Sequence, residues 1–303
     1  MRYAVTGAAG FIGSHLAERL GELGHEVVGF DCFTDYYDPA LKEENARDLD
    51  VRRVDLAEDP LDFAGFDGVF HLAGQPGVRS FGDVFPLYLR RNVLASQRVF
   101  EAAARDGVRV VFGSSSSVYG AAERYPTPED APPHPLSPYG ITKLACEQLA
   151  DAYRRQFGLD AVVVRYFNAF GPRQRPDMAF TRIVFALAEG AAFVLYGDGD
   201  QSRSWTYVAD IVEGTILAME RGSGTYNVGG ALEASMNESI GLLERISGRA
   251  LEVRRQPAVP GDQRRTKADT TRIRGELGWE PRVSLEEGLA RQWAWASARV
   301  GAA

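Results

Sequence analysis

The stretch "SPYGITK", residues 137–143, sets a phenol and an ammonium one helical turn apart. Ser137 and Pro138 are typical of an N-cap and a first helical residue, because serine caps free amides and proline has no amide to lose. Tyr139 and Lys143 then lie on the same face of the helix that begins there. On seven residues alone such a pair is more often a solvated face than a catalytic one. The rest of the chain has to decide whether this tyrosine transfers protons.

A glycine-rich loop near the N-terminus is the second chemical signal. "TGAAGFIG" places Gly7, Gly10 and Gly13 between a short apolar run and an amphipathic helical pattern. The first glycine permits a tight turn, the second lets a pyrophosphate approach the backbone, and the third lets the helix pack close to a sheet. The helix N-terminus supplies amides and a positive dipole for the phosphates. Asp31, at the end of the next apolar run, would accept hydrogen bonds from an adenosine ribose and repel a 2′-phosphate, which favours NAD over NADP.

The composition is that of an ordinary globular protein, with 303 residues, 45% of them hydrophobic and 25% charged. The net charge of -7 argues against a nucleic-acid-binding surface, which needs a basic face. No apolar run is long enough to span a membrane, and glycines and His15 interrupt any signal-peptide core, so we expect a cytoplasmic protein. Cys32, Cys146 and the scattered histidines predict neither a disulfide framework nor a metal site.

Apolar runs alternate with helical patterns along the first half of the chain. The sequence predicts strands at 2–7, 26–31, 51–56, 68–74, 108–115 and 160–168. It predicts helices at 11–24, 84–107 and 138–157. The proline-rich segment 125–138 is predicted to be a loop. Because strands that alternate with helices form parallel βαβ units, the predicted fold class is α/β, with a Rossmann-type doubly wound parallel sheet.

After Asn168 the alternation loosens, which predicts a smaller C-terminal α/β lobe. Two helical patterns and one strand-and-turn pattern share this part of the chain, at 179–191, 236–248 and 193–208. We therefore predict an NAD-binding domain of residues 1–168, with later segments at about 206–233 returning to it. The rest of 169–303 would form a discontinuous, mainly substrate-binding lobe. The cleft between the two, outside the carboxyl ends of the strands, is the expected substrate site.

A series of motifs resembles, in order, the landmarks of the extended short-chain dehydrogenase/reductase superfamily over nearly the whole chain. They are "TGAAGFIGSHL", "VDL" with Asp55, "HLAG" at 71–74, "SSSSVYG" at 114–120, "YGITK" at 139–143 and "RYFNAFGP" at 165–172. "DGDQSRSWTYVAD" (198–210) and "LGWEP" (277–281) resemble its sugar-nucleotide-modifying branch. The resemblance implies NAD as the cofactor, held by Gly7, Gly10, Phe11, Ile12, Gly13, Asp31, Asp55, Leu56, Leu72, Ala73, Gly74, Tyr139 and Lys143.

The resemblance also implies the catalytic roles. Tyr139 would be the base, and Lys143 would tune it and orient the nicotinamide ribose. A free phenol keeps its proton up to about pH 10, and a nearby ammonium favours the phenolate. Ser115 would contact the sugar O4 and help to pass a proton. Superfamily members that dehydrate or decarboxylate the sugar carry acids at the places of Ser116 and Ser117, so this chain is left with oxidation at C4 and hydride return, the chemistry of a nucleotide-sugar 4-epimerase.

Three further residues are expected, by the same resemblance, to hold the nucleotide sugar beside Ser115, Ser116, Ser117 and Tyr139. They are Asn168, Arg203 on the diphosphate and Asp262 on the nucleotide ribose. UDP-galactose epimerases place a second phosphate-binding arginine where this chain has Val259, which is a departure from their pattern.

The segment "GPRQRPDMAF", 171–180, resembles UDP-glucuronate 4-epimerases, in which an arginine at the place of Arg175 faces the sugar carboxylate. Arg79 is a second candidate for that contact. The predicted reaction is therefore NAD-dependent 4-epimerisation of UDP-glucuronate and UDP-galacturonate. Two alternatives stay open: epimerisation of UDP-glucose and UDP-galactose, and a non-catalytic NAD-binding regulator. Helices at 84–106 and 138–157 are expected to pair in a homodimer, as in relatives of the superfamily.

Overall fold

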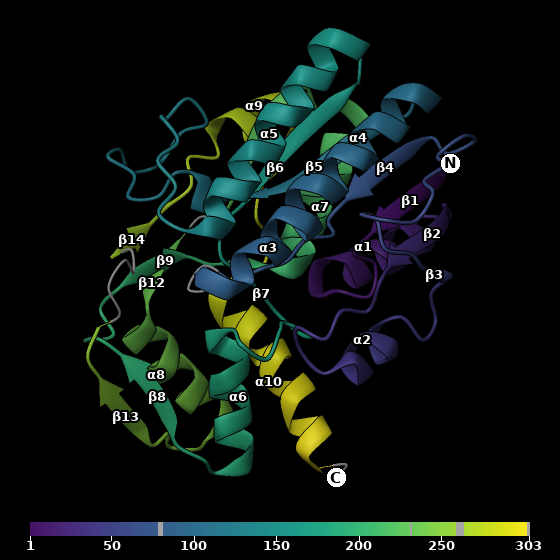
Figure 1. Ribbon diagram of the computed structural model, residues 1–303. Helices are drawn as coiled ribbons and strands as arrows, with labels where there is room; N and C mark the ends of the chain where they lie inside the picture. Colours follow the sequence, from purple (N-terminus) through teal and green to yellow (C-terminus); the bar gives the residue numbers. More distant parts are fainter. Residues whose placement is uncertain (78–80, 231, 259–263, 302–303) are drawn as a thin grey trace.

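The computed structural model describes residues 1–77, 81–230, 232–258 and 264–301, and it is built around one large sheet (Figure 1). Within the described residues this sheet has seven parallel strands in the order β11-β6-β5-β4-β1-β2-β3. The strands are β1 (Arg2–Thr6), β2 (Glu26–Asp31), β3 (Val51–Arg53), β4 (Gly68–His71), β5 (Arg109–Ser115), β6 (Ala161–Tyr166) and β11 (Gly224–Val228). The predicted Rossmann-type sheet is confirmed.

The inner strands are short runs of apolar residues because helices cover both of their faces. Val110, Val111 and Phe112 of β5 are fully buried although they alternate between the two faces. Val111 packs in the core under α1 (Phe11–Glu22), α7 (Val208–Arg221) and α9 (Thr271–Leu277). Val110 and Phe112 pack on the opposite face under α4 (Ala95–Asp106) and α5 (Pro138–Phe157). Figure 1 shows α4 and α5 side by side across that face.

The helix predicted at 84–107 is present but is not uniform. A 3-10 turn at Gly82–Val84 leads into α3 (Phe85–Tyr88), a π-helical segment η2 (Leu89–Leu94) and then α4. The wider η2 turn carries Asn92, which is 1% exposed. Its Oδ1 accepts a hydrogen bond from the amide of Gln75, at 2.6 Å, and its Nδ2 donates to Thr142 of α5, at 3.0 Å. This segment therefore joins the loop after β4 to the helix that carries Tyr139 and Lys143.

A second, smaller group of elements has its own apolar core and lies below the sheet in Figure 1. Its helices are α6 (Ala179–Glu189), α8 (Met236–Ser247) and α10 (Leu285–Gly301). Its short strands are β8 (Phe193–Tyr196) beside β13 (Val253–Gln256), β9 (Ser202–Ser204) between β12 (Glu233–Ser235) and β14 (Arg265–Thr266), and β7 (Ala169–Phe170) beside β10 (Thr206–Tyr207). The predicted patterns at 179–191, 193–208 and 236–248 correspond to these elements. Among the helices, sequence patterns had not indicated α2 (Pro39–Asn45), α7, α9 or α10.

The helices of the described segments lack the combination of length and apolar character that a membrane crossing requires. The same segments contain no group of three or more histidine, cysteine or acidic side chains placed to hold a metal ion.

Candidate active site

The glycine-rich loop joins β1 to α1 with almost no free space. Gly7 has a φ of +73°, and a Cβ at this residue would lie 2.8 Å from the backbone nitrogen of Ala73. A Cβ at Gly13 would lie 2.0 Å from the carbonyl oxygen of Gly7, so α1 reaches its place only because residue 13 has no side chain. Gly10 is the N-cap of α1 and offers no side-chain oxygen. The amides of the first helical turn are therefore left for an anionic ligand.

One pocket beside this loop takes in every residue that was predicted to bind the cofactor. Its walls include Gly7, Gly10, Phe11, Ile12, Gly13, Asp31, Asp55, Leu56, Leu72, Ala73, Gly74, Tyr139 and Lys143. They come from the carboxyl ends of β1, β2 and β4, from the segment after β3 and from the first turns of α1 and α5. Parallel strands bring their carboxyl ends to one edge of a sheet, which is how segments so distant in sequence meet.

Asp31 ends β2 at the wall of this pocket. Its Oδ2 accepts a hydrogen bond from the amide of Ala9 at 3.1 Å, and its Oδ1 accepts one from the amide of Phe33 at 2.8 Å. Burial raises the pKa of this carboxyl, against the opposing effects of the two amides and of Lys42. Lys42 itself is 6% exposed and donates to the carbonyl and the hydroxyl of Thr34, at 2.8 and 2.7 Å. The carboxylate is thus fixed in orientation before any ribose binds.

Helix α5 presents Tyr139 and Lys143 to the same pocket. The helix begins as predicted, because the Oγ of Ser137 accepts a hydrogen bond from the amide of Gly140 at 3.1 Å. Lys143 is 4% exposed, and its Nζ donates to the carbonyl of Gly113 at 2.8 Å.

The charge of Lys143 affects the pKa of His71, which ends the strand β4. His71 lies between the hydroxyls of Thr6 and Ser96, at 2.7 and 2.9 Å, and is fully buried. Burial, and then the charge of Lys143, lower the pKa of His71 to about 3. The imidazole is therefore neutral at physiological pH.

The serine turn follows β5, and its residues divide between the pocket and the turn itself. Ser114 lines the pocket, and its hydroxyl donates to Glu147 of α5. Ser115, Ser116 and Ser117 are half-buried and are not among the residues that line the pocket. The Oγ of Ser115 donates to the Oγ of Ser117 and accepts from its amide, both at 3.1 Å. Successive strand residues point to opposite faces, which separates Ser114 from Ser115.

Arg175 reaches the pocket from the loop between β7 and α6. Burial is the largest single influence and lowers the pKa of the guanidinium, but the hydrogen bond and charge of Asp177, together with Tyr36 and Tyr139, more than offset it, so the pKa is raised. Arg175 and Tyr139 thus line the same pocket.

The loop that carries Arg175 is anchored by the residue before it. Gln174 is 2% exposed, and its Oε1 accepts from the amide of Thr181 at 3.2 Å and from the Nε2 of Gln292 at 3.0 Å. The hydroxyl of Thr181 also donates to the carbonyl of Gln174, at 2.9 Å. This buried cluster ties the loop to α6 and α10, while Arg175 extends to the pocket.

The other predicted substrate residues are placed differently or lie outside the described residues. Asn168 does not end β6 as predicted but lies two residues beyond it, with a φ of +39°, and its Nδ2 donates to Thr266 at 2.8 Å. Arg203 lies on β9, and its Nη1 donates to the carbonyl of Ser202 at 2.8 Å. Neither residue lines the pocket. Arg79, Val259 and Asp262 lie outside the described residues.

The sequence profile of the "NAD dependent epimerase/dehydratase family" matches residues 3–229. That range holds the glycine loop, Asp31, the serine turn and the Tyr139–Lys143 pair. The chain belongs to the NAD dependent epimerase/dehydratase family. This confirms the resemblance that the motifs had indicated.

Relatives of the family align over nearly their full length. UDP-glucuronic acid 4-epimerase from Bacillus cereus, solved in complex with UDP-glucuronic acid and NAD, is 37% identical, with a TM-score of 0.95 over 99% of this chain and 100% of that one. MoeE5, solved in complex with NAD and either UDP-glucuronic acid or UDP-glucose, is 40% identical; the UDP-glucose complex has a TM-score of 0.89 over 100% of both chains. UDP-glucose 4-epimerase from Mycolicibacterium smegmatis is 38% identical over 96% of this chain and 97% of its own.

NAD is the family's cofactor, and the pocket fits it. A dinucleotide needs free amides for its pyrophosphate, an acceptor for its ribose and apolar walls for its rings. The uncapped first turn of α1, the oriented Asp31 carboxylate, and the side chains of Leu56 and Leu72 supply these features.

The pocket also contains residues that sequence reasoning missed. They are Phe30, Cys32, Thr34, Tyr36, Tyr37, Lys42, Val54, Gln75, Pro76, Arg91, Ala95, Gly113, Ser114 and Tyr166. Many of them directly follow or end a strand of the main sheet, and that position was the available signal, because such loops surround the site in doubly wound folds.

Proposed function

We propose that this protein is an NAD-dependent 4-epimerase of UDP-glucuronate and UDP-galacturonate. The observation that carries the proposal is the position of Arg175, which lines the same pocket as Tyr139. A guanidinium beside the reacting end of a sugar is suited to a C6 carboxylate. The B. cereus relative and MoeE5, both solved with UDP-glucuronic acid, support this choice.

Tyr139 takes the proton from the sugar O4. The 4-keto sugar then rotates in its pocket, and Tyr139 returns the proton to O4 as the hydride returns to C4. Lys143, buried near the start of α5, stabilises the phenolate form of Tyr139. Tyr139 has this form before it takes the proton and again after it has returned it. Bound NAD supplies the hydride acceptor and, in the second half of the cycle, the hydride donor. Ser115, at the end of β5, bonds the O4 atom through its hydroxyl and helps to pass the proton. The polar side chains of Ser116 and Ser117 provide no acid for elimination.

The nucleotide sugar is held by residues of both halves of the chain. Arg203 and Asp262 bind the diphosphate and the nucleotide ribose, Asn168 bonds the sugar nucleotide, and Arg79 is a second partner for the carboxylate. In this proposal residues 1–168, with the segment at about 206–233, bind NAD. The pairing of β11 with β6 supports the assignment of that later segment. The rest of 169–303 binds the nucleotide sugar.

Two predictions about the whole protein accompany the proposal. Exposed apolar side chains on the two helices expected to form a dimer, among them Leu89, Leu94 and Ile141, support a homodimer, which light scattering in solution tests. A cytoplasmic location stays a prediction.

The alternative function, epimerisation of UDP-glucose and UDP-galactose, has support of its own. The UDP-glucose complex of MoeE5 and the M. smegmatis enzyme are relatives at 40% and 38% identity. In addition, the ion pair of Arg175 with Asp177 reduces the net positive charge at the sugar end.

The test is turnover of each sugar nucleotide by the NAD-loaded protein. UDP-glucuronate, UDP-galacturonate and UDP-glucose are supplied singly and in competition, and the products are identified by chromatography. We expect interconversion of the two acidic sugars with a higher kcat/KM than for UDP-glucose. Equal or faster turnover of UDP-glucose would transfer the assignment to the neutral-sugar epimerase. Binding of NAD with no epimer formed from any of the sugars would favour the non-catalytic regulator.

A further inference from the structure

The guanidinium of Arg175 already has a carboxylate partner inside the protein. Its Nε and Nη2 donate to the two carboxylate oxygens of Asp177, both at 3.0 Å. Nη2 also lies 3.2 Å from the sulfur of Met178. Among the described residues none accepts a hydrogen bond from Nη1, so this edge of the guanidinium is the one left for a ligand.

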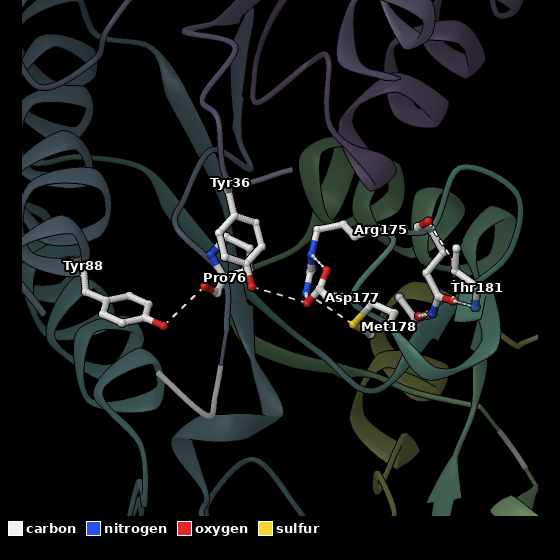
Figure 2. Close-up of polar contacts among 9 residues, drawn as sticks. Tyr36, Pro76, Tyr88, Arg175, Asp177, Met178 and Thr181 are labelled. Carbon is white, nitrogen blue, oxygen red and sulfur yellow. Dashed lines mark hydrogen bonds and ion pairs between the residues drawn. The ribbon is translucent and has the colours of Figure 1, made fainter. Parts of the chain in front are cut away.

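Asp177 also accepts a hydrogen bond from a second residue of the pocket wall, Tyr36. The hydroxyl of Tyr36 donates to its Oδ2 at 3.4 Å, and Figure 2 shows this hydroxyl directed at the carboxylate that Arg175 also faces. Tyr36 lines the pocket from the segment after β2. Burial, and then the charge of Asp177, raise the pKa of Tyr36, which keeps its hydroxyl a donor. The carboxylate is therefore fixed by two segments, one from each half of the chain.

We propose that Asp177 is a specificity-determining residue, which reduces the preference in binding for an acidic over a neutral sugar. It does so because it occupies one edge of the Arg175 guanidinium and balances its charge. This inference rests on the proposed function, in that it takes Arg175 to contact the C6 group of the sugar. The paired side chains carry no net charge. A sugar hydroxyl can accept a hydrogen bond from Nη1 as a carboxylate can, whereas only the carboxylate is repelled by Asp177.

The repulsion acts over a short distance, because both carboxylates would lie against the same guanidinium. Arg175 is 23% exposed at its side chain and Asp177 is 41% exposed, so water screens the interaction only in part. Asparagine has nearly the shape of aspartate and keeps one oxygen that accepts from Arg175. Asp177→Asn should therefore remove the repulsion while the guanidinium keeps its place.

The experiment measures the binding of UDP-glucuronate and UDP-glucose to the NAD-loaded protein by calorimetry, for the parent and for Asp177→Asn. The two ligands share the nucleotide and differ only at C6, so a general loss of folding or of cofactor cancels in the ratio of their dissociation constants. We expect the ratio to move towards the acidic sugar by roughly tenfold, about 1.4 kcal/mol. Asp130→Asn is the matched control: Asp130 also pairs with an arginine, Arg124, but it is 77% exposed, and its arginine does not line the pocket, whereas Asp177 bonds two residues that do. Its ratio should equal that of the parent.

An unchanged ratio in Asp177→Asn, or a shift towards UDP-glucose, would overturn the inference; the shift would mean that Asp177 serves to orient Arg175 for the acid. Asp177→Ser, smaller and also neutral, replaces the first variant if that one folds poorly, and the same shift is expected. Turnover measured in parallel separates the two proposals. UDP-glucuronate that binds with the expected shift but is not epimerised contradicts the proposed function alone, whereas epimerisation without the shift contradicts the role of Asp177 alone.

Discussion

The two ends of the pocket are built by different means. At the cofactor end the backbone forms much of the surface, through the tight turn at Gly7, the close packing at Gly13 and the uncapped first turn of α1. At the end that holds Arg175, which we propose binds the sugar and call the sugar end, side chains form the surface: Arg175 is paired with Asp177, and its loop is anchored by the buried Gln174. Gly7 and Gly13 at the cofactor end cannot take a side chain without a clash, whereas the polar contacts at the sugar end change with single substitutions of their side chains. The cofactor end should therefore bind the same ligand throughout the family, whereas single substitutions at the sugar end should be able to change its substrate specificity.

The largest expected effect falls where the two ends meet, at Tyr139. Tyr139→Phe keeps the ring but loses the proton acceptor, so turnover should fall by at least ~100-fold. Binding of NAD and of the sugar nucleotide should stay near that of the parent, which calorimetry checks. Tyr153→Phe, on the same helix and away from the pocket, should keep its turnover. A Tyr139→Phe enzyme with more than about a tenth of parental kcat would show that another group is the base.

At the sugar end, Arg175→Ala should remove most of the preference for UDP-glucuronate. Hydrogen bonds to charged groups contribute about 1.5–3 kcal/mol, which is roughly ten- to a hundredfold in relative kcat/KM. The 4-keto form of the acidic sugar is a β-keto acid, so an enzyme that no longer holds its carboxylate should also release some UDP-pentose and carbon dioxide. A competition assay with chromatography of the products measures both effects. Arg124→Ala, an exposed arginine that is also paired with an aspartate, is the control. A full preference in Arg175→Ala would remove this residue from the sugar site.

The difference between the backbone-built cofactor end and the side-chain-built sugar end also explains how much of the site the sequence could predict. Local patterns specify the cofactor end: Gly7, Gly10 and Gly13 lie within one turn and one helix start, and β2 has the predicted bounds of 26–31. Tyr139 and Lys143 are likewise one turn apart on a helix whose cap, Ser137, is adjacent.

The sugar end depends on pairs that no local pattern announces. Tyr36 and Asp177 are separated by 141 residues, and Gln174 and Gln292 by 118. Arg175 could be proposed from a motif. The bond between Asp177 and Tyr36 could not, because it depends on how two loops far apart in the sequence meet in the fold. The expected helix at 84–107 shows a related limit, because the buried Asn92 sits in a π-helical turn that hydrophobic spacing does not reveal.

The backbone end is tested by adding one methyl group. At Gly13 a Cβ would lie 2.0 Å from the carbonyl oxygen of Gly7, so Gly13→Ala must push α1 away from the turn. Overpacking costs about 1–3 kcal/mol, and we expect NAD to bind roughly tenfold more weakly, with a lower melting temperature. In Gly21→Ala, on the same helix, the new methyl group meets nothing within 4 Å. That control should bind NAD as the parent does and gain about 0.5–1 kcal/mol in its free energy of unfolding. Equal NAD affinity in the two variants would contradict the close-packing account.

The smallest expected effect concerns His15, which connects the two ends. Its Nε2 lies 3.0 Å from the carbonyl oxygen of Pro172, so α1 is joined to the loop that carries Arg175. Burial, and then the charge of Arg173, lower the pKa of His15 to about 4.

In the unfolded chain this pKa returns to about 6.5. Between pH 6.5 and about 4 the unfolded state therefore holds a proton that the folded state lacks, and stability falls as the pH falls. His15→Gln should reduce the slope of unfolding free energy against pH, in this window, by up to about 1.4 kcal/mol per pH unit. Urea unfolding at several pH values measures it, and the carboxylates that titrate in the same range cancel between variant and parent. An equal slope in His15→Gln would mean that the imidazole is open to protonation in the folded state, and that α1 and the Arg175 loop are less tightly joined than the contact with Pro172 indicates.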